Sequence, residues 1–98
     1  MKTIENAIQH LPRFSTVLVA CDSDRSRSEL IDLLGRRELS ILGPAATAGQ
    51  AMTLASHAPA DLAIIDLRLA DDQRGGRNLA DQLSKTWGMQ TLLLETPA

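Results

Sequence analysis

Short apolar runs alternate along the chain with stretches whose apolar residues recur every three or four positions. Runs of this length, rich in Val, Ile and Leu, predict strands buried on both faces of a sheet. The alternation predicts an α/β domain with a parallel sheet and a helix between each pair of strands. The four apolar runs are residues 16–21, 39–43, 62–65 and 91–94, and the three helical stretches are 25–37, 45–58 and the segment between Gly76 and Gly88.

Polar and helix-breaking residues set the expected ends of these elements. Asp22-Ser23-Asp24 follows the first strand and can cap the first helix, because its side-chain oxygens accept hydrogen bonds from free N–H groups. Gly43-Pro44 is expected to end the second strand, and Thr47 to cap the second helix. Pro59 closes that helix, and Gly88 ends the third.

The first residues form a separate expected unit. Ile4, Ala7, Ile8 and Leu11 have the spacing of one helical face, and Pro12 stops the pattern. We therefore divide the chain into an amphipathic helix with its linker at residues 1–14 and a main domain at residues 15–98. The apolar helix face either covers the core or forms a dimer contact.

Composition narrows the classes of partner. The chain has 98 residues, 44% of them hydrophobic, and a formal net charge of −2 with acidic and basic residues interspersed. Nucleic acid and anionic membranes are bound through clustered basic charge, so neither is expected as a partner. No apolar run approaches membrane-spanning length. The single cysteine, Cys21, cannot form an internal disulfide, which fits a cytoplasmic protein.

Acidic residues follow several of the predicted strands. Parallel strands end at the same edge of a sheet, so Cys21-Asp22, Asp66 and Glu95-Thr96 are expected to approach one another. Carboxylates held close together repel unless a cation lies between them, and Mg²⁺ suits such oxygen ligands. This predicts a magnesium site at Asp22 and Asp66. A carboxylate beside the metal could also attack phosphorus and form an aspartyl phosphate.

A purely structural interpretation stays open beside this one. Asp is frequent after strands, because it caps helices and favours turns. Asp22 could simply cap the first helix, and Asp66 could simply open a loop. Periodicity alone favours these structural roles.

Three segments together resemble the receiver domain of two-component response regulators. The resemblance covers residues 16–96 and implies a flavodoxin-like, doubly wound parallel sheet truncated to about four strands in the order 2-1-3-4. It also implies a signalling module rather than an enzyme. A phosphatase of the haloacid type is disfavoured, because Arg68 stands where such an enzyme needs a second Asp. The segments that carry the resemblance are residues 17–24, 46–51 and 59–69.

The resemblance also implies roles for single residues. Asp66 matches the phosphoacceptor, and Asp22 matches one residue of the acidic pair that binds Mg²⁺. Arg68 matches the position whose backbone carbonyl completes the metal site. Gly76 matches the glycine that opens the third helix. Thr96 can provide the switch hydroxyl if the alignment shifts by one residue from Glu95.

Two departures from the family pattern affect these expectations. Cys21 stands where the first acid of the pair is expected, which should weaken Mg²⁺ binding. The sequence stops before the fourth helix, fifth strand and fifth helix of the family, and the lysine that contacts the phosphoryl group goes with them. Residues 92–94 should then lie on an open sheet edge, which invites pairing with another chain. We expect a homodimer or a hetero-complex.

Two functions follow from the resemblance. In the first, a histidine kinase or phosphotransfer protein phosphorylates Asp66, and the altered surface binds a downstream protein partner. In the second, the chain is a degenerate receiver that acts as an interaction or dimerisation module without phosphorylation. Asp66 and Asp22 favour the first function, while Cys21 and the missing lysine favour the second.

Overall fold

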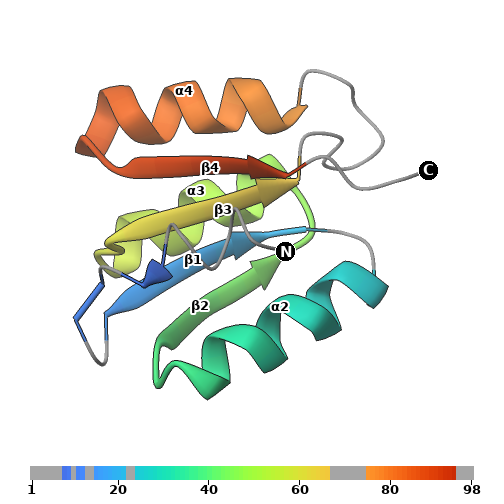
Figure 1. Ribbon diagram of the computed structural model, residues 1–98. Helices are drawn as coiled ribbons and strands as arrows, with labels where there is room; N and C mark the ends of the chain where they lie inside the picture. Colours follow the sequence, from blue (N-terminus) through green and yellow to red (C-terminus); the bar gives the residue numbers. More distant parts are fainter. Residues whose placement is uncertain (1–7, 10, 13–14, 22–23, 67–74, 95–98) are drawn as a thin grey trace.

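The computed structural model describes residues 8–9, 11–12, 15–21, 24–66 and 75–94, with the backbone alone for residues 24–26. Four parallel strands form one sheet in the order β2-β1-β3-β4 (Figure 1). The predicted flavodoxin-like sheet with strand order 2-1-3-4 is confirmed. The strands are β1 (Thr16–Ala20), β2 (Ser40–Ala45), β3 (Leu62–Asp66) and β4 (Gln90–Leu94).

Helices cover both faces of the sheet. One face packs against α2 (Asp24–Arg36), and the other packs against α3 (Ala48–His57) and α4 (Gly75–Trp87). Each helix begins and ends within about three residues of its predicted position. None of the helices in the described part of the chain is long and apolar enough to cross a membrane.

The sheet separates two apolar clusters. Along β1, Leu18 and Ala20 face the cluster under α3 and α4, while Val17 and Val19 face the cluster under α2. β3 alternates in the same way, and all five of its residues are buried. Both central strands are thus buried on both faces, as their continuous apolar runs predict.

The N-terminal segment is described at a few positions. Ile8 is buried in the cluster under α2, and the Leu11 N–H donates a hydrogen bond to the Ile8 carbonyl at 3.0 Å. At this position the segment covers the core. Residues 1–7 and 10, which carry the rest of the predicted helix, lie outside the described residues.

The sequence prediction for the end of the second strand is wrong. β2 does not stop at Gly43-Pro44 but continues to Ala45, whose carbonyl accepts a hydrogen bond from the Cys21 N–H at 2.9 Å. Proline is tolerated there because β2 is an edge strand of the sheet.

Candidate functional site

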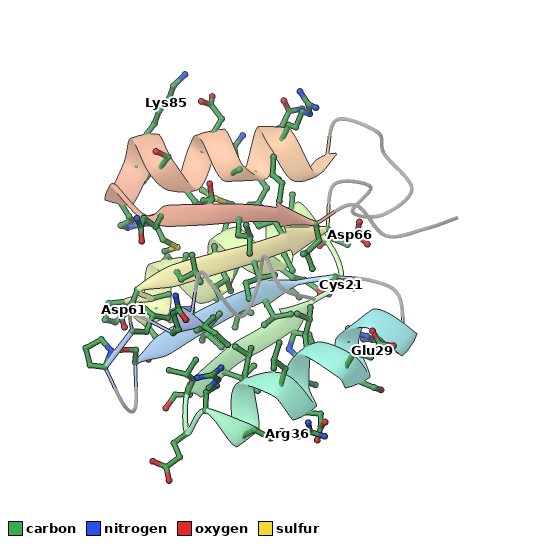
Figure 2. All side chains as sticks on the ribbon, viewed as in Figure 1. Cys21, Glu29, Arg36, Asp61, Asp66 and Lys85 are labelled. Atoms are coloured by element: carbon green, nitrogen blue, oxygen red, sulfur yellow. The ribbon has the colours of Figure 1, made fainter. Side chains whose placement is uncertain are left out.

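Cys21 and Asp66 come together at the carboxyl edge of the two central strands. β1 and β3 pair in parallel, with Ala20 opposite Ile65, so Cys21 follows one strand where Asp66 ends the other. The Cys21 Sγ donates a hydrogen bond to Asp66 Oδ2 over 3.7 Å. In Figure 2 both labelled side chains lie at the same end of the sheet.

Asp66 is a buried acid. Its exposed fraction is 2%, and that of Cys21 is 0%. An ionised carboxylate is costly to bury unless hydrogen-bond donors or charges compensate for the lost water. Among the described residues, no buried side-chain oxygen or nitrogen lacks a hydrogen-bond partner. The Asp66 side chain is therefore enclosed by the protein and hydrogen-bonded to it, instead of lying in solvent at a strand end.

The opposite end of the same strand pair carries a second polar contact. The Thr16 N–H donates to Asp61 Oδ2 at 2.9 Å, and the Asp61 N–H donates to the Thr16 carbonyl at 2.8 Å. Asp61 is exposed, and Figure 2 places it far from Asp66 along the sheet. It therefore aligns the strands that carry the site but takes no part in its chemistry.

Several predicted site residues fall outside the described part of the chain. These are Asp22, Arg68 and Thr96, together with Glu95. Gly76 is described: it is the buried second residue of α4, in the first turn of the helix that it was expected to open. Leu94 pairs with Asp66, so the carboxyl end of β4 lies beside the acid. The structure thus brings together Asp66, Cys21 and the end of β4.

Of the three predicted magnesium ligands, the structure describes Asp66. Asp22 and the Arg68 carbonyl, the other predicted ligands, are not described, and the described residues contain no group of three or more His, Cys, Asp or Glu side chains that could hold a metal. The Cys21 thiol, which contacts Asp66, is a soft ligand and suits Mg²⁺ poorly. The magnesium site stays a prediction.

Sequence reasoning expected Cys21-Asp22 and Asp66 to approach one another but did not predict a hydrogen bond between Cys21 and Asp66. Cys21 belongs to the apolar cluster under α2. Its thiol also donates a hydrogen bond to the Asp66 carboxylate. The spacing holds the missing signal: Thr16 and Asp61 lie 45 residues apart, and so do Cys21 and Asp66. Placing Thr16 beside Asp61, the residue before β3, therefore also places Cys21 beside Asp66.

Comparison with known proteins identifies the fold. No family model matches the chain, and neither does any curated protein. Among solved structures, the response regulator PhyR from Brucella abortus superposes with a TM-score of 0.75 and 14% identity, over 94% of this chain and 38% of PhyR. The MaeR response regulator bound to beryllium trifluoride gives 0.73 and 17%, over 86% of this chain and 69% of MaeR.

A third neighbour has the highest identity of the three. The non-phosphorylated HemR receiver domain from Leptospira biflexa gives a TM-score of 0.67 and 24% identity, over 86% of this chain and 68% of that one. The chain therefore has the fold of response regulator receiver domains. It spans 38% of the length of PhyR and about two thirds of the other two chains.

Proposed function

We propose that this chain is a receiver-like signalling domain that accepts a phosphoryl group on Asp66. The observation that carries the proposal is the position of this acid: it ends the central strand β3 of a receiver-type sheet, at the carboxyl edge. Ligand chemistry in open α/β sheets gathers at that edge. The donor is a histidine kinase or a phosphotransfer protein, and the output is a changed surface that binds a downstream protein partner.

The proposed reaction is a transfer between two side chains. A carboxylate oxygen of Asp66 attacks the phosphorus of a phosphohistidine, so that an O–P bond forms and the N–P bond breaks. The imidazole leaves with the electron pair and takes up a proton from water. Because Asp66 is 2% exposed, the donor reaches it only after local opening of the site.

A similar protein suggests a probe for this chain. MaeR binds beryllium trifluoride, a trigonal group that imitates phosphoryl. Saturable binding of beryllium trifluoride at Asp66 would support the same chemistry here. We place this signalling in the cytoplasm, the compartment that the single free cysteine fits.

The second candidate function is a degenerate receiver that works as an interaction module without phosphorylation. The contact of the Cys21 thiol with Asp66 Oδ2 favours it, because a donor already occupies one carboxylate oxygen. The burial of both side chains favours it too. In this case the fold presents a binding surface whose shape does not depend on phosphate.

Phosphate uptake distinguishes the two functions. The purified chain is incubated with a small phosphodonor and Mg²⁺, and its intact mass is measured. We expect one phosphoryl adduct that is lost in Asp66→Asn and retained in Asp61→Asn, because Asp61 lies at the opposite end of the strand pair. Absence of an adduct in the wild-type chain would favour the interaction module.

A further inference from the structure

The sulfur of Cys21 lies against the carboxyl group of Asp66. The Sγ is 3.7 Å from Asp66 Oδ2, and both side chains are buried. The backbone imposes the same proximity, because Ala20 pairs with Ile65 and the two residues follow directly in their strands. A reactive group formed on Asp66 would therefore lie within reach of the thiol in the folded protein.

Phosphorylation would turn this carboxyl group into such a reactive group. A carboxylate resists nucleophiles, whereas the carbonyl carbon of an acyl phosphate carries phosphate as a good leaving group. That carbon is bonded to the oxygen that the thiol contacts, and rotation about the Asp66 Cβ–Cγ bond is soft enough to turn it toward the sulfur. A thiol is a strong nucleophile, and an attacking group held in place gains several orders of magnitude over one in solution.

We infer that Cys21 discharges phosphorylated Asp66 by attacking its carbonyl carbon, so that the chain limits the lifetime of its own phosphorylated state. A C–S bond forms and the bond from the carbonyl carbon to the phosphate oxygen breaks. The phosphate leaves with that electron pair and takes up the thiol proton. Water then attacks the thioester, which restores the Asp66 carboxyl group and the Cys21 thiol. The inference rests on the proposed function, because it requires a phosphoryl group on Asp66.

The fate of a water oxygen tests this route. The wild-type chain is phosphorylated with a small phosphodonor and Mg²⁺, freed of the donor and left to decay in ¹⁸O-labelled water. Hydrolysis by attack of water on phosphorus would place the label in the released phosphate. The thioester route places one ¹⁸O atom in the Asp66 carboxyl group and none in the phosphate. We expect the second result, measured by mass spectrometry of the phosphate and of the peptide that contains Asp66.

The thioester has its own signature during the decay. After quenching in acid and unfolding, we expect a species one molecule of water lighter than the unphosphorylated chain. This species should not react with a maleimide, because Cys21 is the single cysteine of the chain and its sulfur is bonded to Asp66. Asp66→Asn should produce neither the lighter species nor the labelled carboxyl group.

Two variants separate the nucleophile from the hydrogen bond. Cys21→Ala removes both, whereas Cys21→Ser keeps a donor beside Asp66 but replaces the thiol with a much weaker nucleophile. We expect the phosphoryl adduct to last at least about tenfold longer in both variants than in the wild-type chain. A merely structural contact would be rescued by Ser and would not move the label. If neither variant folds, the position of the label in the wild-type chain decides alone.

The outcomes distinguish this inference from the proposed function. A wild-type adduct whose decay labels the phosphate overturns the inference and leaves phosphorylation of Asp66 standing. A labelled carboxyl group that persists in Cys21→Ala also overturns the inference alone, because the attacking group is then not this sulfur. Absence of an adduct from the wild-type chain and from both variants contradicts the proposed function itself, and the inference falls with it.

Discussion

Gly43 occupies a backbone conformation that other residues adopt at a cost. Its φ angle is +111°, and a Cβ built there would lie 2.8 Å from the Val19 carbonyl oxygen and 2.9 Å from the Ala45 nitrogen. It lies where the pairing of β2 with β1 shifts by one residue, between Leu18 and Ala20. The glycine therefore lets an edge strand stay close to β1, whose next residue, Cys21, contacts Asp66.

Substitution of Gly43 by Ala should lower the free energy of unfolding by about 2 kcal/mol or more, since both the φ angle and the two backbone contacts oppose a Cβ. Urea unfolding measures this as a lower midpoint. The matched control is Gly35→Ala: Gly35 lies in the last turn of α2, and no atom of the described residues outside its own helical turn comes within 4 Å of the place a Cβ would take. We expect the control to gain about 0.5–1 kcal/mol from helix propensity. Equal effects of the two substitutions would contradict this account.

At the scale of elements, α3 shows how local sequence fixes an end. Thr47 is its N-cap, and the Thr47 Oγ1 accepts a hydrogen bond from the Gln50 N–H at 3.1 Å. The Gln50 side chain reaches back and accepts a hydrogen bond from the Ala46 N–H at 2.8 Å. Two free N–H groups near the start of the helix are thus satisfied by neighbours in the sequence.

Removal of the Thr47 hydroxyl should destabilise the protein. We expect Thr47→Ala to lower the free energy of unfolding by about 1 kcal/mol and Thr47→Ser to keep most of the stability. Thr53→Ala is the control in the same helix, because the Thr53 hydroxyl donates to the Gly49 carbonyl and caps nothing. Its effect should stay below about 0.5 kcal/mol. A loss at Thr53 as large as at Thr47 would count against the cap.

The helices and central strands could be predicted because their signals are local. Thr47 caps α3 as its residue type predicts, and Gly88, with a φ of 65°, ends α4. Leu30 and Leu34 are buried under α2 as their spacing predicts. The central strand β3 is predicted by its continuous apolar run, and it ends at Asp66, the acid that follows that run in the sequence.

The remaining features depend on partners far away in the chain. Pro44 reads as a strand end, yet β2 continues because an edge strand can leave one side unpaired. Ile31 and Trp87 carry helical apolar spacing but are 41% and 42% exposed. The contact of Cys21 with Asp66 depends on how two strands align, which no local pattern specifies.

At the scale of the whole molecule, β4 lies at one edge of the sheet. In the described part of the chain it pairs with β3 alone, and its own sequence contains no charged residue. Leu92 and Leu94 are half-buried against the cluster under α2, while Leu93 is 40% exposed. An uncharged strand edge with exposed apolar residues favours pairing with another strand.

We therefore predict that the 98-residue chain associates in solution through β4. Light scattering should show a mass above that of the monomer at micromolar concentration, and Leu93→Lys should shift the chain toward monomer, because charge on an edge strand opposes pairing. Ile31→Lys is the matched control, since Ile31 is 41% exposed but lies on α2. A stable wild-type monomer would contradict the prediction, as would equal effects of the two lysines.

The contacts at the two ends of β1 and β3 also bear on how the chain avoids mispairing. Strands that are apolar on both faces can slip past each other and still bury their side chains, so hydrophobic burial selects their alignment weakly. A slipped β3 would separate Asp61 from Thr16 and Asp66 from Cys21 at the same time. A slipped alignment that keeps the apolar residues buried would therefore lose both polar contacts and be less stable than the native alignment. The acid proposed to receive phosphate thus also helps to select which of several nearly equivalent sheets the chain folds into.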